Sequence, residues 1–345
     1  MTTTAAWEAN ADAATIAAWL KEQKSVAVLT HGKPDGDAVG STMAAVRALH
    51  RVGVDAMPWY SEPVPRWLPD LAGGTPFKLV EHDGLPSADA ALVLDTGSWN
   101  QLEAVRPWLE GKSSKAALID HHLRGDGDAA DMRLIDTSAA AACQLAADLA
   151  ACLLDCAKTE LPQDIAEACY LGTATDTGWF KHSNVSPRVL RDAADLLQAG
   201  VDHSRLFQLT EQRDRPARLA LMGRSLSSLT FHAEGAVAIQ SLTEQDFEDT
   251  GASPGDSGGF VDQPMTVDAV RVSAVLTEIR AKDGSVLTKI SMRSKEGPRA
   301  VDVNQVAGTL GGGGHARASG ARVAGDVAEV LPRLLQELST AMGMS

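Results

Sequence analysis

The sequence predicts an α/β protein in which a mostly parallel sheet flanked by helices is followed by a smaller α+β domain. In the first half, short β-rich segments alternate with amphipathic helical segments, which is the pattern of βαβ units. After about residue 230, strand-like segments follow one another, and the Asp-Gly pair of the segment AKDG indicates a hairpin. A chain of 345 residues is also long for one hydrophobic core, so we expect two domains.

The first half begins with an amphipathic helix over residues 13–24. Hydrophobic periodicity separates the segments that follow into strands and helices. The expected strands are 25–30, 54–60, 88–95 and 115–120, with a further one at 132–138. The expected helices are 37–53, 138–156, 162–175 and 187–200. This order predicts a first domain over residues 1–200.

The second half has a different character. We expect strands at 235–242, 269–280 and 285–294, a loop rich in Gly, Pro and Asp at 251–264, and a closing helix at 326–341. The polar segment 210–218 lies in the connecting region. We therefore expect a helical linker at 201–225 and a second domain at 226–345.

Composition restricts the class of ligand. The formal net charge of −14 argues against a long basic groove for duplex DNA, although small phosphorylated ligands can be neutralised locally by metal ions and a few basic residues. The four cysteines form no Cys-x-x-Cys pair, so we expect buried free thiols and a cytoplasmic protein. The N-terminal segment does not have the features of a signal peptide, and no apolar run approaches the ~20 residues that span a bilayer.

Metal-ligand side chains follow three of the predicted strands. They are His31, Asp35 and Asp37 after the first strand, Asp95 after the third, and Asp120, His121 and His122 at the end of the fourth. The carboxyl ends of parallel strands share one edge of a sheet, where ligands bind. The apolar run LVLDTG ends on the lone acid Asp95, which is costly near a core unless a cation holds it ionised.

The number of ligands favours two divalent cations over one. Several carboxylates with two or three imidazoles exceed what a tetrahedral zinc ion needs. Imidazole ligands favour Mn²⁺ over Mg²⁺, and two such ions can share a carboxylate. Each acid taken singly is more typical of a turn or helix cap, and an EF-hand fails because Val39 and Val46 replace its ligands.

Two further features lie outside these strand ends. Asp176 ends a helical run, where alone it reads as a turn or helix-end residue. The segment GTLGGGGHARASG contains four consecutive glycines before His315, which permits backbone amides to converge on an anion, although a flexible linker is the alternative. Arg293 lies at a strand end, from which its guanidinium could reach a phosphate.

These motifs together resemble a known family. HGKPDGDAVGS, LVLDTG, LIDHH and GTATDTGWF resemble the four motifs of the DHH phosphoesterase superfamily, and SMRSK with VDVNQVAGTLGGGGHARASG resembles the DHHA1 domain. Length and order are similar to the nano-RNase subfamily of bifunctional oligoribonucleases and pAp phosphatases. The resemblance implies a catalytic DHH domain, a substrate-binding DHHA1 domain and an active site in the cleft between them.

The resemblance also implies roles for individual residues. One cation would be held by His31, Asp35 and Asp95. The second would be held by Asp37, Asp95, His121 and Asp176, so that Asp95 bridges the two. His122 would face the scissile phosphate, and Asp120 would orient a ligand. The implied substrate-binding residues of the second domain are Arg293, Asn304, Gly312, Gly313, Gly314 and His315.

The implied activity is hydrolysis of short oligoribonucleotides to mononucleotides and of 3′-phosphoadenosine 5′-phosphate (pAp) to AMP. Mn²⁺ is the expected metal, with Mg²⁺ and Co²⁺ as alternatives. Alternative activities are a cyclic dinucleotide phosphodiesterase, a family II-like inorganic pyrophosphatase and a single-strand DNA exonuclease. We expect partners among short RNA or nucleotides, a homodimer by analogy, and neither long duplex nucleic acid nor membrane. The dipeptide Gly32-Lys33 differs from what relatives often have in the first motif, but this difference removes none of the expected ligands.

Overall fold

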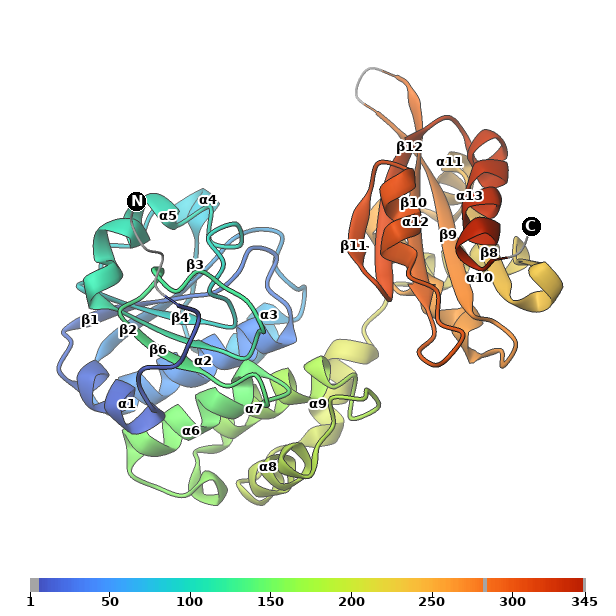
Figure 1. Cartoon of the computed structure of the whole chain (residues 1–345). Helices are drawn as coiled ribbons and strands as arrows, with labels where there is room; N and C mark the ends of the chain where they lie inside the picture. Colours follow the sequence, from blue (N-terminus) through green and yellow to red (C-terminus); the bar gives the residue numbers. More distant parts are fainter. Residues whose placement is uncertain (1–5, 282–283, 344–345) are drawn as a thin grey trace. The chain divides into compact units, whose positions relative to one another are not determined.

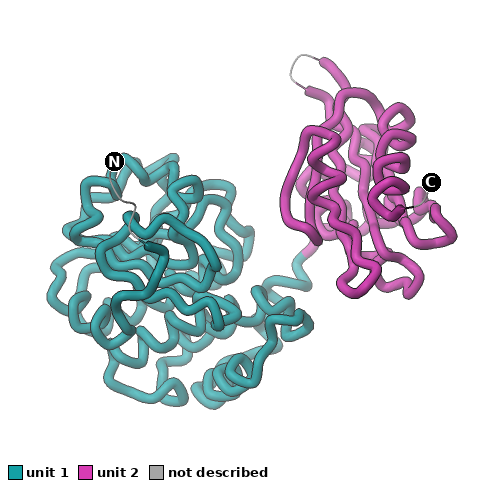
Figure 2. Tube along the Cα trace, viewed as in Figure 1, with its two compact units in different colours: residues 1–213 teal, residues 214–345 magenta. Residues whose placement is uncertain are grey.

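The computed structural model describes residues 6–281 and 284–343. The chain divides into two compact units, unit 1 up to Arg213 and unit 2 from Asp214 onward (Figure 2). No helix within the described part of the chain is long and apolar enough to cross a membrane.

Unit 1 is built on a six-stranded sheet in which every neighbouring pair of strands is parallel. The strand order is β3-β2-β1-β4-β5-β6, which confirms the predicted α/β class (Figure 1). The strands are β1 (Ser25–Leu29), β2 (Asp55–Tyr60), β3 (Lys78–Leu79), β4 (Ala90–Leu94), β5 (Ala116–Asp120) and β6 (Met132–Ile135). The edge strand β3 was not predicted, because two residues are too few to show a period.

Helices flank this sheet. They are α1 (Ala13–Lys21), α2 (Gly36–Arg51), α3 (Leu68–Ala72), α4 (Val80–Asp83), α5 (Arg106–Leu109), α6 (Ala142–Leu154), α7 (Gln163–Asp176), α8 (Pro187–Gln198) and α9 (His203–Glu211). Two 3₁₀ segments are also present: η1 (Glu110–Lys115) lies between α5 and β5, and η2 (Lys158–Glu160) lies between α6 and α7. Almost all of α2 is buried, and it contacts both α6 and α7. The helix predicted to begin at residue 138 begins only at Ala142, which matters for the site below.

Unit 2 contains a second six-stranded sheet, in the order β11-β12-β10-β9-β8-β7. The strands are β7 (Thr230–His232), β8 (Val237–Leu242), β9 (Val272–Arg280), β10 (Val286–Ser294), β11 (Gly313–His315) and β12 (Ala318–Ala324). All pairs are antiparallel except β8 with β9. The predicted hairpin strands β9 and β10 do pair antiparallel, while Asp283 of the predicted turn lies outside the described residues.

The helices of unit 2 are α10 (Pro216–Ser227), α11 (Glu244–Thr250), α12 (Val303–Thr309) and α13 (Val327–Ala341). Its 3₁₀ segments are η3 (Ala233–Gly235), η4 (Pro254–Ser257) and η5 (Phe260–Thr266), the last two within the segment predicted as a loop. Residues of α12 and α13 share a core with one face of the sheet. A separate cluster from α10, α11 and η5 packs on the opposite face, against β8 and β9.

The expected linker at 201–225 contains α9 and most of α10, and the division between the units falls inside it. Its role as a linker between a catalytic and a binding domain stays a prediction. A flexible linker was the alternative interpretation of the glycine-rich segment, but Gly313–His315 forms the edge strand β11. This strand is short and pairs only with β12.

Candidate active site

Three neighbouring strands bring the predicted ligands to one edge of the sheet. Because β1, β4 and β5 are adjacent, His31, Asp95 and His121 leave the sheet side by side. Asp95 adopts a left-handed backbone conformation with a φ of 62°, which aspartate tolerates better than most residues. This turn ends the apolar strand β4 and leaves the Asp95 side chain buried.

The start of α2 supplies two more acids with different environments. Asp35 is the N-cap residue and accepts hydrogen bonds from the backbone N–H groups of Asp37 (3.0 Å) and Ala38 (3.1 Å). The fully buried Asp37 side chain accepts from the backbone N–H groups of Ala142 (2.5 Å) and Cys143 (2.8 Å) at the start of α6. The N-terminus of α6 therefore fixes the Asp37 carboxylate and stabilises its negative charge.

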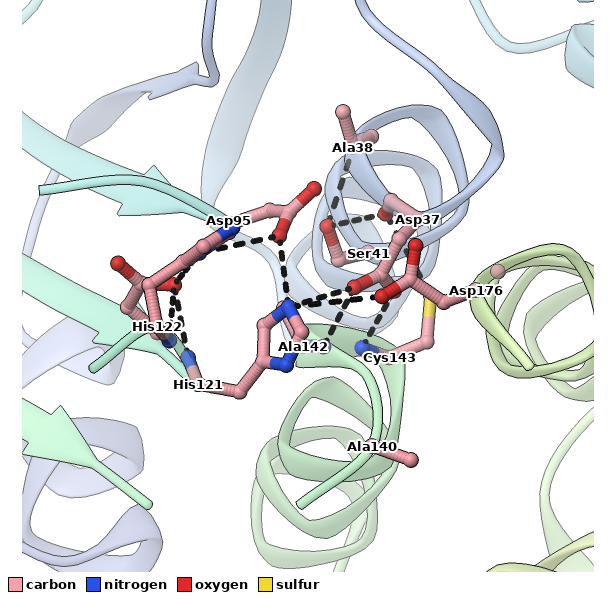
Figure 3. A network of polar contacts seen from close by, with 12 residues as sticks. Asp37, Ala38, Ser41, Asp95, His121, His122, Ala140, Ala142, Cys143 and Asp176 are labelled. Atoms are coloured by element: carbon pink, nitrogen blue, oxygen red, sulfur yellow. Dashed lines mark hydrogen bonds and ion pairs between the residues drawn. The ribbon is translucent and has the colours of Figure 1, made fainter. Parts of the chain in front are cut away.

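The predicted ligands form two groups that meet at Asp95, and Figure 3 shows the group that contains Asp37, His121 and Asp176. In the first group, His31 Nε2 lies 3.3 Å from Asp95 Oδ2 and 3.8 Å from Asp35 Oδ1. In the second, His121 Nε2 lies 3.4 Å from Asp95 Oδ1, 3.7 Å from Asp37 Oδ2 and 3.6 Å from Asp176 Oδ2. Each oxygen of Asp95 therefore faces a different group.

These donor atoms suit divalent cations. Ligand atoms that bind one ion at about 2.1 Å, approaching at right angles, lie roughly 3 Å apart, close to the spacings seen here. Asp95 Oδ1 is buried and receives no well-aligned hydrogen bond within the described residues. A buried carboxylate oxygen without a donor is costly, and a cation would remove that cost. The donor set, four carboxylates and two imidazoles, fits two ions better than one.

The charges in this cluster shift one another's ionisation. Burial and the negative charge of Asp95 raise the pKa of Asp176 to about 6. Burial, together with Asp95 and Asp176, also raises the pKa of Asp37. Burial of the His31 and His121 rings opposes their protonation, but contacts with Asp95 outweigh it and raise both pKa values to about 9. In the absence of cations, protons bound to these histidines and buried carboxyl groups therefore compensate part of the negative charge of the cluster.

His122 and Asp120 form a pair beside the two groups. Asp120 Oδ1 accepts from the backbone N–H groups of His121 (2.7 Å) and His122 (3.2 Å) and lies 2.7 Å from His122 Nδ1. The hydrogen bond to Asp120, opposed by burial, raises the pKa of His122. Asp120 is fully buried, whereas the His122 side chain is 54% exposed. Asp120 therefore orients an imidazole that is open to a ligand.

Close helix packing places Asp37 near Asp176. A Cβ atom at Gly172 of α7 would lie 2.2 Å from Cys143 Sγ and 2.8 Å from Asp37 Oδ1. Only glycine therefore permits α7 to approach α2 and α6 this closely. Sequence reasoning missed this role, since one glycine within a helical run does not show what it faces.

A cavity of about 620 Å³ opens over the cluster. Besides the predicted site residues of unit 1 other than Asp37, its lining includes Thr96, Gly97, Ser98, Asn100, Gln101 and Arg124. None of these six was predicted, although all follow β4 or β5, so the strand-end rule could have found them. Lys33, the local departure noted above, lines a separate cavity together with Gly32.

The structure places the other predicted residues in unit 2. Arg293, Gly312 and Gly313 line a cavity of about 490 Å³, whereas Asn304, Gly314 and His315 are not among its described lining residues. Arg293 Nε lies 3.2 Å from Asp262 Oδ1. His315 is exposed on the edge strand β11. The contribution of these residues to substrate binding stays a prediction.

Family models match both parts of the chain. The DHH family, N-terminal domain, matches residues 25–173, and the DHHA1 domain matches residues 234–344. The chain is 34% identical to a bifunctional oligoribonuclease and PAP phosphatase NrnA of Thermus thermophilus, over 90% of this chain and 87% of the relative.

Solved structures show the same fold at lower identity. An exopolyphosphatase-related protein from Bacteroides fragilis superposes with a TM-score of 0.84 at 23% identity, over 95% of this chain and 96% of that chain. Exonuclease RecJ bound to manganese superposes with a TM-score of 0.56 at 17% identity, over 99% of this chain and 97% of that chain.

Proposed function

The chain belongs to the DHH family of phosphoesterases, which are hydrolytic enzymes, and on this premise we propose that it hydrolyses short oligoribonucleotides to mononucleotides and pAp to AMP. The observation that supports this proposal most strongly is the position of Asp95, which faces one group of ligands with each of its two oxygens. We propose that His31, Asp35 and Asp95 hold one divalent cation, and that Asp37, Asp95, His121 and Asp176 hold the other.

When bound, two such cations would supply Lewis acidity, stabilising the negative charge that develops on a phosphate during hydrolysis. The chain's own residues keep the donor atoms in place. The α6 amides fix Asp37, and Asp35 is tied to the first turn of α2. Asp120 holds the ring of His122, whose exposed side would donate a proton or a hydrogen bond to the substrate phosphate.

The choice of substrates and metal draws on the relatives. The Thermus thermophilus relative is named for both oligoribonuclease and PAP phosphatase activity, and it aligns over most of both chains. The manganese in RecJ, a protein of the same fold, supports Mn²⁺ as the cation. The chain's charge of −14 also favours short over long nucleic acids, since a long strand would meet more repulsion.

The test is a profile of initial rates with Mn²⁺, Mg²⁺ and Co²⁺ across pAp, diadenylate, longer oligoadenylates, cyclic di-AMP, pyrophosphate and single-stranded DNA. We expect Mn²⁺-dependent turnover that is fastest for pAp and the shortest oligoribonucleotides. Preferred turnover of cyclic di-AMP, pyrophosphate or single-stranded DNA would contradict the proposed substrates. Full activity in excess chelator would contradict the proposed use of cations.

A further inference from the structure

One face of the unit 2 sheet is left open over β10 and β12. Residues alternate along both strands, so that Ile290 and Met292 of β10 point into the core beneath α12 and α13. The intervening residues of β10 and β12 lie on the opposite face, where they line the cavity of about 490 Å³. Figure 1 shows α12 and α13 beside this sheet.

This open face contains two cations directly opposite each other. Lys289 of β10 pairs in register with Arg322 of β12, so their side chains share the face. Like charges on directly opposed strand positions destabilise a sheet. Within the described residues, neither side chain forms a hydrogen bond or ion pair. An anion between them would remove the repulsion.

The rest of the cavity suits a polyanion. No acidic residue is among its described lining residues, although the whole chain is strongly acidic. Gly313 and Gly320 are opposed on β11 and β12, so backbone rather than side chains forms part of the floor. Arg293 lies on the same face of β10 as Lys289, four residues and therefore about 13 Å along the strand. This spacing exceeds the distance between neighbouring phosphates in a single strand of nucleic acid.

We propose that Lys289 and Arg322 form a phosphate subsite for a short single-stranded ribonucleotide, separate from the position of Arg293. The inference deepens the proposed function and rests on it. A ligand with several phosphates in a row can contact both Arg293 and the Lys289–Arg322 pair. A single nucleotide such as pAp carries only two phosphate groups, so it offers these three cations fewer phosphates than an oligoribonucleotide does. The subsite therefore favours oligoribonucleotides of three or more residues over pAp.

The experiment compares the full-length chain with K289A/R322A. Fluorescence anisotropy measures binding of labelled pentaadenylate in Ca²⁺ without turnover, and kinetics in Mn²⁺ measure KM for pentaadenylate and pAp. The control R191A/R333A removes two positive charges from exposed helix positions that have no ion pair among the described residues. We expect K289A/R322A to raise KM for pentaadenylate, relative to that for pAp, ~10-fold, and the control to leave this ratio unchanged.

Salt dependence gives a second readout. Losing two phosphate contacts makes the slope of log Kd against log salt shallower by about 1.4, since each contact to a single strand adds ~0.7. Equal slopes and equal KM ratios in K289A/R322A and the parent chain would overturn the proposal. The proposal would also be overturned if the parent chain formed a dimer, and K289A/R322A were monomeric with unchanged affinity for RNA. The open face would then bind a second copy of the chain.

The proposed function can fail separately. Parent chain that binds pentaadenylate through this pair but hydrolyses neither substrate contradicts the activity and supports the subsite. The opposite outcome is that the parent chain hydrolyses both substrates while K289A/R322A binds and hydrolyses pentaadenylate normally. That result would support the proposed activity and contradict the subsite.

Discussion

The strand-end edge of unit 1 and the open sheet face of unit 2 both gather like charges, but with opposite sign and different burial. In unit 1, Asp37 and Asp95 are almost fully buried and fixed by neighbouring groups. In unit 2, Arg322 is exposed and Lys289 is half-buried, and both have long, mobile stems. Buried, rigid carboxylates suit small cations, whereas exposed cations suit a flexible polyanion. The predictions below test this contrast, in order of expected effect.

The largest effect is expected for Asp95→Asn. An amide keeps the shape but removes the charge shared by both ligand groups, so we expect kcat to fall by ~10³-fold or more. The same change removes the ion pairs of Asp95 with His31 and His121, so the chelator-treated variant should melt below the parent at neutral pH. Steady-state kinetics and thermal denaturation measure the two effects.

Asp131→Asn is the matched control, since its carboxylate is exposed and has no partner among the described residues. This control should retain parental kinetics. Near-normal turnover by D95N in Mn²⁺ would remove the basis for two cations bridged by Asp95.

A smaller effect is expected for Arg293→Ala in unit 2. If the guanidinium contacts a substrate phosphate, its loss raises KM roughly 10- to 100-fold, because hydrogen bonds to charged groups contribute about 1.5–3 kcal/mol. R293K keeps the charge but loses the planar fork, so we expect it to recover only part of the loss. An unchanged KM for both pAp and diadenylate would contradict a contact between Arg293 and the substrate.

Gly172→Ala tests the packing that supports the buried acids. The added methyl meets Cys143 Sγ and Asp37, so α7 must move away from α2 and α6. We expect a loss of about 1–3 kcal/mol in the free energy of unfolding, together with weaker Mn²⁺ activation. Chemical denaturation and an Mn²⁺ titration of activity measure both. In Gly223→Ala, the helix position is open, so stability should hold or rise; destabilisation there would undermine the packing argument.

The pH dependence of stability should differ with and without metal. The folded pKa values of His31 and His121, about 9, exceed their ordinary value of 6.5, so their stabilising effect is complete below about pH 6.5. In chelator, the melting temperature should therefore fall as pH rises from 6.5 to 9. Because Mn²⁺ binds neutral imidazoles, the increase in melting temperature on adding Mn²⁺ should become larger over the same pH range. Parallel curves with and without Mn²⁺ would argue against histidine ligands.

The smallest effect concerns the segment before α1. Trp7 Nε1 donates a hydrogen bond to the His122 carbonyl (3.0 Å), and its ring occupies the space over Gly97 and Gly125. In Trp7→Phe, the hydrogen bond is lost and the smaller ring keeps only part of the contact with Gly97 and Gly125, so we expect kcat to fall by less than ~10-fold. Trp7→Ala should lower kcat further. If W7A is as active as W7F, the ring does not position His122.

The strand-end residues of unit 1 were accessible from sequence because a parallel sheet brings the ends of β1, β4 and β5 to one edge. Asp176 could not be identified in this way, because its position at the end of a long helix does not show which residues it faces. Only the resemblance to the family indicated Asp176 as a ligand. The amides of Ala142 and Cys143 were also missed, because the α6 periodicity extends into the preceding loop. In unit 2, the short strand β11 was missed because glycines carry no side-chain pattern.

The central claim is that unit 1 holds two divalent cations joined by Asp95. The most direct measurement is anomalous diffraction at the manganese edge from crystals grown in Mn²⁺. We expect two peaks, one against each oxygen of Asp95, with His31 and Asp35 beside one and Asp37, His121 and Asp176 beside the other. A single peak distant from Asp95, or no peak in an active crystal, would contradict the account.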